Sequence, residues 1–182
     1  MTIKFIQRIE LGSISADITF SSIPQTEYTD LLLVYSLRTD LGPSFAFDDC
    51  SIRVNNDSGA NYTNQLVQTR DGSMSAGGGS GQTNILSPEA SAAGASGNTF
   101  GNGEIYISNY RSSAPKTFSC KGGSETNSTT AVVQMFNFGL WNSTAPITSL
   151  YLYSRNGRNF VAGSSATLYG IKKGSDGTTT VS

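Results

Sequence analysis

Histidine is absent from the 182 residues of this chain, and charged residues make up only 14% of it. Without histidine the chain cannot form a Ser-His-Asp or Cys-His triad, and it lacks the commonest general base and metal ligand. Its two cysteines, Cys50 and Cys120, lie far apart and form no Cys-x-x-Cys pair, which argues against a zinc site. We therefore expect no catalytic residue, no metal, no cofactor and no enzymatic activity.

A pair of carboxylates is the one catalytic alternative that composition leaves open, because glycoside hydrolysis needs only two acids. Asp48-Asp49 is the only adjacent pair among the 13 acidic residues, and we interpret it as solvated residues at the start of a strand. The remaining aspartates considered for this role are expected in turns or at outward strand positions: Asp17, Asp30, Asp57, Asp71 and Asp176.

Positive charge is also scarce and scattered, because the 12 lysines and arginines stand singly apart from Lys172-Lys173 and the net charge is −1. A nucleic-acid partner is therefore not expected, since such binding depends on a basic field over the phosphates. No stretch approaches the roughly 20 apolar residues of a membrane-spanning helix, so no membrane partner is expected. The opening "MTIKFIQRIELGS" has no continuous apolar run and predicts no signal peptide. Cys50 and Cys120 are accordingly expected to be reduced and buried.

Alternation of apolar and polar residues, which is typical of half-buried strands, recurs from end to end. "ISADITF" places Ile14, Ala16, Ile18 and Phe20 on one face, whereas "TDLLLVYSLR" is apolar on both faces, as a central strand would be. We predict about ten strands from this pattern and no convincing helix. The candidate strands are residues 14–20, 29–38, 50–55, 62–69, 103–110, 116–122, 131–141, 147–154, 159–163 and 166–171.

Turns and loops complete the prediction. Residues 152–161, "LYSRNGRNFV", are typical of a hairpin, with Asn156-Gly157 as its tight turn. Residues 70–84 and 88–103 have almost no large side chains, so we predict exposed loops there, with "ILSP" as a small apolar anchor between them.

Short connections rule out parallel crossovers and favour an all-β fold, an antiparallel β-sandwich that is jelly-roll-like and has little or no helix. We expect residues 1–173 to form a single sandwich domain and residues 174–182 to form a flexible C-terminal arm.

Trp141 is the one side chain that suggests a ligand, because a tryptophan beside Asn137 and Asn142 could stack on a sugar ring. The competing interpretation is that Trp141 belongs to the core or to an interface, as a tryptophan after a strongly apolar strand usually does. The sequence supports the core interpretation over the glycan contact, but both remain open.

Four blocks of the sequence resemble a group of tailed-bacteriophage structural proteins. The blocks are "ITFSSIPQTEYTDLLLVYSLR", "NTFGNGEIYISNY", "LWNSTAPITSLYLYS" and "NFVAGSSATLYGIKK", and the resemblance covers residues 16–173. One departure is Ser108, where the group often has proline. The resemblance implies a virion β-sandwich without enzymatic activity and brings no catalytic residues with it.

The resemblance also implies that the protein lies on the surface of a virion and is made in the host cytoplasm. We expect a capsid decoration (cement) protein that binds the major capsid protein or another virion protein as a homo-oligomer, with a trimer favoured. The absence of a fibre shaft favours the capsid over a tail fibre. The alternative is a receptor- or glycan-binding domain of a tail fibre or tail appendage, with Trp141 as its sugar contact. The candidate partner contacts lie near the two ends of the chain: Thr2, Lys4, Arg8, Lys172 and Lys173.

Overall fold

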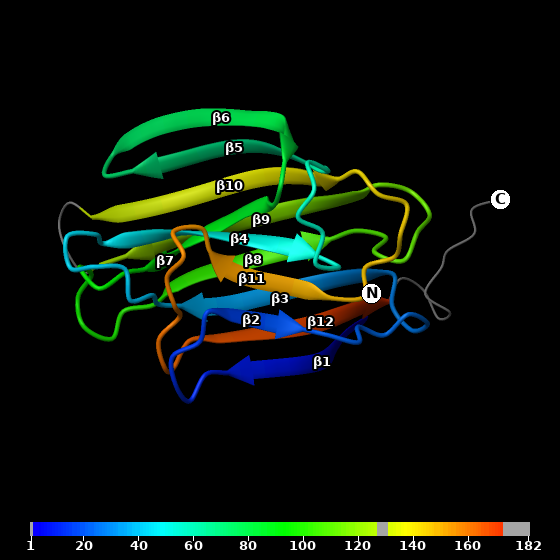
Figure 1. The fold of residues 1–182 in the computed structure, drawn as a ribbon, viewed down its shortest axis with the longest axis horizontal. Helices are drawn as coiled ribbons and strands as arrows, with labels where there is room; N and C mark the ends of the chain where they lie inside the picture. Colours follow the sequence, from blue (N-terminus) through cyan, green and yellow to red (C-terminus); the bar gives the residue numbers. More distant parts are fainter. Residues whose placement is uncertain (1, 127–130, 173–182) are drawn as a thin grey trace.

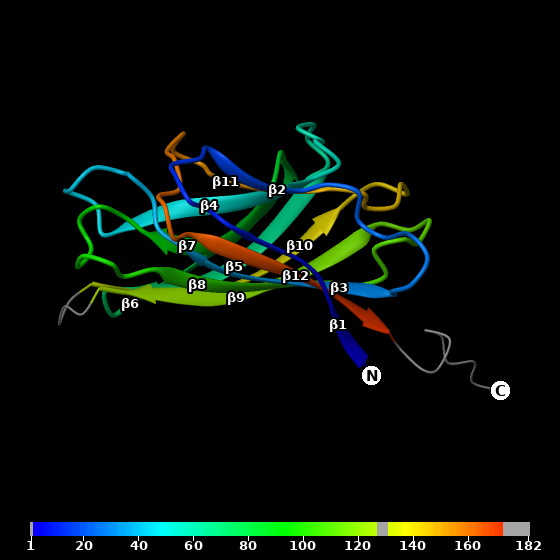
Figure 2. The ribbon, with the colours of Figure 1, turned by 90° about the horizontal axis from the view of Figure 1, so that it is seen from below.

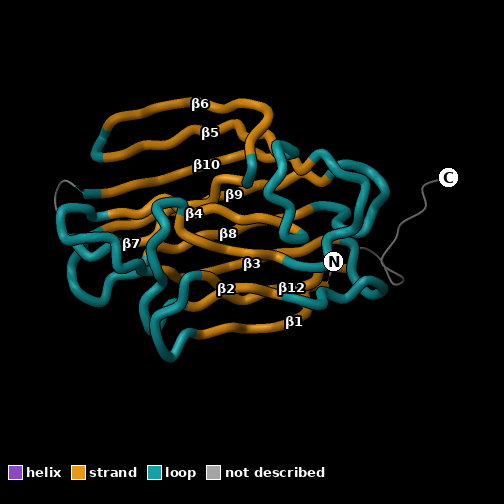
Figure 3. The backbone as a smooth tube through the Cα atoms, in the orientation of Figure 1, coloured by secondary structure: helices purple, strands orange, loops and turns teal. Residues whose placement is uncertain are grey.

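Twelve β-strands and no helix make up residues 2–126 and 131–172, the part of the chain that the computed structural model describes (Figure 3). The strands are β1 (Thr2–Glu10), β2 (Asp17–Phe20), β3 (Asp30–Leu37), β4 (Phe47–Val54), β5 (Tyr62–Arg70), β6 (Ser73–Gln82), β7 (Ile85–Ser91), β8 (Gly101–Ile107), β9 (Lys116–Glu125), β10 (Val132–Trp141), β11 (Leu150–Ser154) and β12 (Ser165–Lys172). These residues contain no helix that could span a membrane.

The strands form two antiparallel sheets that pack face to face (Figures 1 and 2). The large sheet has eight strands in the order β1-β12-β3-β8-β9-β10-β5-β6, and the small sheet has four in the order β2-β11-β4-β7. This arrangement confirms the predicted antiparallel β-sandwich.

The pairing of strands is nested in the manner of a jelly roll. β1 pairs with β12, β2 with β11, β3 with β8 and β4 with β7, so an incoming half of the chain lies against a returning half, as two Greek keys require. The hairpins β5–β6 and β9–β10 are insertions into this plan. They pair with each other through β10 and β5 and extend the large sheet by four strands.

The core lies between the two sheets, where alternate residues of each strand point inward. Strand β3 contributes Leu31 and Leu33, and β11 contributes Leu150 and Leu152, all of them fully buried. Each such side chain stabilises the fold by roughly 1.5–3 kcal/mol relative to an exposed one. Cys50 and Cys120 are free and lie in the same core, which confirms that both thiols are buried.

The loops predicted at 70–84 and 88–103 are mostly wrong, because β6 and β7 occupy much of this stretch. Strand β6 is held by its hydrogen-bonded register with β5, from Arg70 against Ser73 to Tyr62 against Gln82. Strand β7 is covered by β8, β9 and β10 of the large sheet, and its small side chains allow that close approach. For β6, whose residues are almost all exposed, backbone pairing supplies the order that side-chain burial does not. Residues 92–100 do form the expected irregular connection.

The hairpin predicted at 152–161 is also wrong. Strand β11 ends at Ser154, Gly157 has the expected positive φ of 65°, but residues 159–163 form no strand. Phe160 is buried instead and makes isolated bridges to Ser15 and Thr39. The chain then crosses to the large sheet as β12, because burial of the Phe160 ring in the core directs it away from β11.

The N-terminal residues form a strand that the alternation did not predict, β1 at the edge of the large sheet. Ile14, in contrast, was expected on the buried face with Ile18 and Phe20, but it is exposed because β2 begins only at Asp17. The proposed C-terminal arm, 174–182, lies outside the described residues.

Candidate partner-binding surfaces

Three of the candidate contact residues come together at one corner of the large sheet. Thr2 pairs directly with Lys172 across β1 and β12. The ammonium groups of Lys4 and Lys172 lie 3.5 and 3.2 Å from Glu27 Oε1. The hydrogen bond from Lys172, together with those from Tyr28 and Lys4, holds the pKa of Glu27 below its ordinary value. This corner, formed by residues 2–5 together with Glu27 and Lys172, is called the β1 corner below.

The other two candidates do not join this cluster. Arg8 lies further along β1 and forms an ion pair with Glu10 of the same strand, at 2.8 Å. Lys173 lies outside the described residues.

Two exposed apolar side chains on β1 were not singled out from the sequence. Ile3 is half exposed and Phe5 is 62% exposed, and the Phe5 ring contacts Tyr169 edge to face with centroids 6.4 Å apart. Within the described residues no strand pairs with the free side of β1. The β1 corner therefore presents an unpaired backbone edge with two lysines on one face and two exposed apolar side chains on the other, and such an edge is suited to pairing with a strand of another protein. The signal available in the sequence was the pair of apolar residues in "TIKF".

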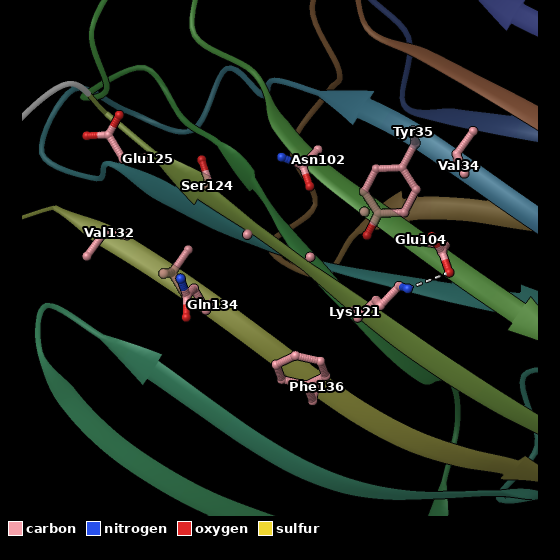
Figure 4. Close-up of a pocket in the computed structure, with 14 residues that line it drawn as sticks. Val34, Tyr35, Asn102, Glu104, Lys121, Ser124, Glu125, Val132, Gln134 and Phe136 are labelled. Carbon is pink, nitrogen blue, oxygen red and sulfur yellow. Dashed lines mark ion pairs between the residues drawn. The ribbon is translucent and has the colours of Figure 1, made fainter.

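The second surface is the face of the large sheet that points away from the small sheet, called the outer face below. Strands β8, β9 and β10 carry three consecutive rows of paired residues there: Asn102–Gly123–Gln134, Glu104–Lys121–Phe136 and Tyr106–Ser119–Phe138. Phe136 and Phe138 are 58% and 66% exposed. A hollow of about 770 Å³ lies over the first two rows (Figure 4).

Beneath this hollow two strands carry glycines whose missing side chains leave room for an aromatic ring between the sheets. Gly103 and Gly122 pair with each other, and a Cβ at Gly103 would lie 2.1 Å from the Tyr35 ring that packs beneath it. Tyr35 is buried and donates a hydrogen bond to the Pro88 carbonyl at 2.8 Å, so the ring is fixed from below. Burial raises the pKa of Tyr35 well above its ordinary value, so its hydroxyl stays protonated as a donor. Sequence reasoning missed this site because its members come from four strands.

Trp141 does not face solvent, so its assignment as a glycan contact is wrong. The side chain is 2% exposed, and its indole N–H donates to Asp57 Oδ2 at 2.7 Å. The Lys116 ammonium lies 5.5 Å from the ring centroid and is itself buried, which lowers the pKa of Lys116. A sugar therefore cannot stack on this ring. The competing interpretation, a core tryptophan, is confirmed.

Asp48 and Asp30 are buried, contrary to the expectation that they are solvated. Asp48 accepts hydrogen bonds from the Ser154 hydroxyl at 2.8 Å and from Asn156 Nδ2 at 2.7 Å. Asp30 accepts the Asn109 backbone N–H at 2.8 Å and the Tyr106 hydroxyl. The polar partners compensate for the lost hydration of each carboxylate. Both aspartates therefore stabilise neighbouring loops through these hydrogen bonds.

Asp49 points outward and interacts with two arginines, at 3.7 Å from Arg70 and 3.9 Å from Arg155. The adjacent pair Asp48-Asp49 therefore divides between the interior and the surface. The two carboxylates do not face one site together. Among the residues described, no group of three or more aspartate, glutamate or cysteine side chains could hold a metal ion.

No family model matches the chain, and no curated protein matches it.

Proposed function

We propose that this protein is a structural component of a bacteriophage virion, a capsid decoration protein attached to the head surface. The observation that carries the proposal is the β1 corner, where the edge strand has Thr2 and Lys4 beside Lys172 on one face and the exposed Ile3 and Phe5 on the other. An edge strand with apolar side chains and flexible cations can add to a sheet of the capsid protein or cover its surface.

The four blocks that resemble phage structural proteins also support this proposal. They coincide with strands β2, β3, β8, β11 and β12, which belong to the nested jelly-roll pairing. The inserted hairpins, in contrast, contribute almost nothing to the blocks. The resemblance therefore concerns the strands that determine the fold and follows their order along the chain.

We further propose that the protein binds the particle as a homo-oligomer, with a trimer as the favoured form. Closed symmetric oligomers use the same surface on every copy, and a specific interface needs about 800 Å² from each partner. The exposed apolar residues of β1 and β5 contribute to such surface: Ile3, Phe5 and Val67. Light scattering on the purified protein tests this part directly.

The decisive experiment for the attachment site compares two phenylalanines with similar exposure. Phe5→Asp places a charge in the β1 corner, whereas Phe45→Asp changes a loop residue that is 56% exposed. Purified variants are mixed with phage heads that lack the protein and are then sedimented. We expect the wild type and Phe45→Asp to bind the heads and Phe5→Asp to remain in solution.

Labelling of intact particles tests the location itself. Immuno-gold label or reconstructed density over the head surface supports decoration. Label found only at the tail tip refutes decoration and supports the alternative, a receptor-binding domain of a tail appendage.

A further inference from the structure

We propose that the hollow on the outer face binds a neutral polysaccharide chain. This inference goes beyond a role in decorating the capsid and does not depend on it, because the hollow and the β1 corner use different residues. The hollow lies over β8, β9 and β10, whereas the β1 corner is formed by β1, the end of β12 and Glu27.

A missing side chain gives the hollow its depth. Gly123 lies between Asn102 on β8 and Gln134 on β10, and its backbone forms the floor between these two amides. Neighbouring strands are about 4.8 Å apart, so the two amide-bearing strands are separated by roughly 10 Å. The volume of about 770 Å³ falls within the range of small-molecule sites.

Hydrogen-bonding groups surround this floor and are available to a ligand. Asn102 and Gln134 have no side-chain hydrogen-bond partner in the described part of the chain, and each amide can both donate and accept. Lys121 and Glu104 form an ion pair at 3.0 Å along the next row, and Figure 4 shows their charged ends pointing toward one another. Hydroxyl groups of a sugar match this mixture, because each hydroxyl also donates and accepts.

An aromatic face borders the polar groups. Phe136 lies beside Lys121 in the strand register and carries the largest exposed apolar surface of the lining. Phe138 follows two residues later on the same face, at about 6.7 Å along the strand. The apolar C–H face of a pyranose ring can pack on such a ring while its hydroxyls contact the amides. The two phenylalanines therefore offer two aromatic surfaces in a line along β10.

The charge of the site favours a neutral ligand over the other polymers. Lys121 is the only cation among the described lining residues, and Glu104 already neutralises it, so a nucleic acid or an acidic polysaccharide would find no free positive charge. An apolar protein surface is disfavoured for a different reason. It would cover the amides of Asn102 and Gln134 without supplying hydrogen bonds, and such burial is unfavourable.

Calorimetric titration of the purified full chain with neutral oligosaccharides tests the proposal. The probes are cellohexaose, maltohexaose and a galactan, with alginate as the acidic comparison. We expect at least one neutral probe to bind and alginate to bind more weakly. Phe136→Ala should weaken that binding about tenfold, as the loss of one central contact does. Asn102→Ala and Gln134→Ala should each weaken it severalfold, whereas Phe45→Ala should leave it unchanged.

Two results of the titration would overturn the inference. The first is a lack of binding by every neutral probe at millimolar concentration. The second is unchanged binding in all three hollow variants, which would place the sugar elsewhere. A melting temperature equal to that of the wild type confirms that each variant is folded.

Binding to phage heads measured on the same variants separates the two proposals. Loss of head binding in Phe136→Ala would identify the hollow as a protein interface and contradict the sugar site, whereas failure of Phe5→Asp to affect heads would contradict only the β1 corner.

Discussion

The indole N–H of Trp141, at the end of β10, donates a hydrogen bond to Asp57 Oδ2 in the loop between β4 and β5. The same carboxylate accepts the Gly59 backbone N–H at 2.8 Å and the side chain of Asn61. Asp57 therefore holds its own loop in shape and joins that loop to the core through the tryptophan. A residue that suggested ligand binding in the sequence instead stabilises a turn.

Replacing Asp57 with asparagine should destabilise the protein at neutral pH. Burial tends to raise the pKa of Asp57, but the hydrogen bonds from Trp141, Asn61 and Gly59 outweigh it and lower the pKa below 3.8. An acid with a lowered folded-state pKa contributes stability above its unfolded value and loses it as pH falls. We expect Asp57→Asn to cost about 1 kcal/mol at pH 7, measured by urea unfolding. The gap to the wild type should narrow below pH 3.8, and a constant gap would contradict this explanation.

Alanine at Gly103 should be poorly tolerated, because the new Cβ would lie 2.1 Å from Tyr35 Cζ. The Tyr35 ring is buried and hydrogen-bonded, so it cannot move away without losing its partner. Overpacking of this kind costs about 3 kcal/mol. Gly77→Ala on β6 is the matched control, since no atom lies within 4 Å of the new Cβ, and we expect a change below about 0.5 kcal/mol. Equal unfolding midpoints for the two variants would disprove the packing argument.

Breaking the ion pair between Arg70 and Glu89 should make the stability of the protein depend on pH. Glu89 is 3% exposed, and its Oε2 has no hydrogen-bond partner among the described atoms. Burial raises the pKa of Glu89 above 4.5, and Arg70 opposes that shift. Arg70→Met removes the opposition, so the pKa of Glu89 should rise further. A raised folded-state value means that stability is lost as pH increases through it.

We therefore expect Arg70→Met to cost about 2 kcal/mol at pH 8 and clearly less at pH 4. In a Glu89→Gln background the same substitution should cost less than about 1 kcal/mol, because no buried charge is left unpaired. Denaturant unfolding of the four proteins at both pH values measures the coupling. Additive effects at pH 8 would show that the two side chains act independently.

Neither thiol should react in the folded protein. Burial is the main cause that raises the pKa of Cys50 well above its ordinary value, and burial raises that of Cys120 to about 12. The thiolate is the reactive form and is almost absent at such values. Iodoacetamide at pH 8 should leave both cysteines unmodified, and labelling should follow after unfolding in urea. Mass spectrometry distinguishes the two states, and rapid labelling of native protein would show that the core opens.

Some strands could be predicted because their own apolar residues recur at every second position, as in a half-buried strand. Leu31 and Leu33 of β3 flank the less buried Leu32, and Ile52 and Val54 of β4 flank the less buried Arg53, so burial follows the alternation there. Strand β6 has no such signal, since its three consecutive glycines and its serines have no apolar face. Its extended form depends on backbone hydrogen bonds to β5, a partner that local sequence does not reveal.

The candidate sites illustrate the same limit. The lysines near the two ends of the chain could be identified as candidates, but their convergence on Glu27 results from the pairing of β1 with β12. The hollow requires β8, β9 and β10 to align in one register, so that Asn102, Gly123 and Gln134 lie in a row. The large apolar side chain of Trp141 favoured the core, and the structure places it there. The charge of Asp48 and Asp30 favoured the surface, but both are buried.

By itself the sequence determined that the chain forms antiparallel strands with buried thiols, because alternation, scarce charge and short connections act locally. Only the tertiary structure decided which strands are neighbours, how the inserted hairpins widen one sheet and which polar groups are buried. The physical reason is that hydrogen-bond registers and desolvation depend on residues far apart in the chain. Asp30, for example, is stable in the interior only because Asn109 and Tyr106 meet it there.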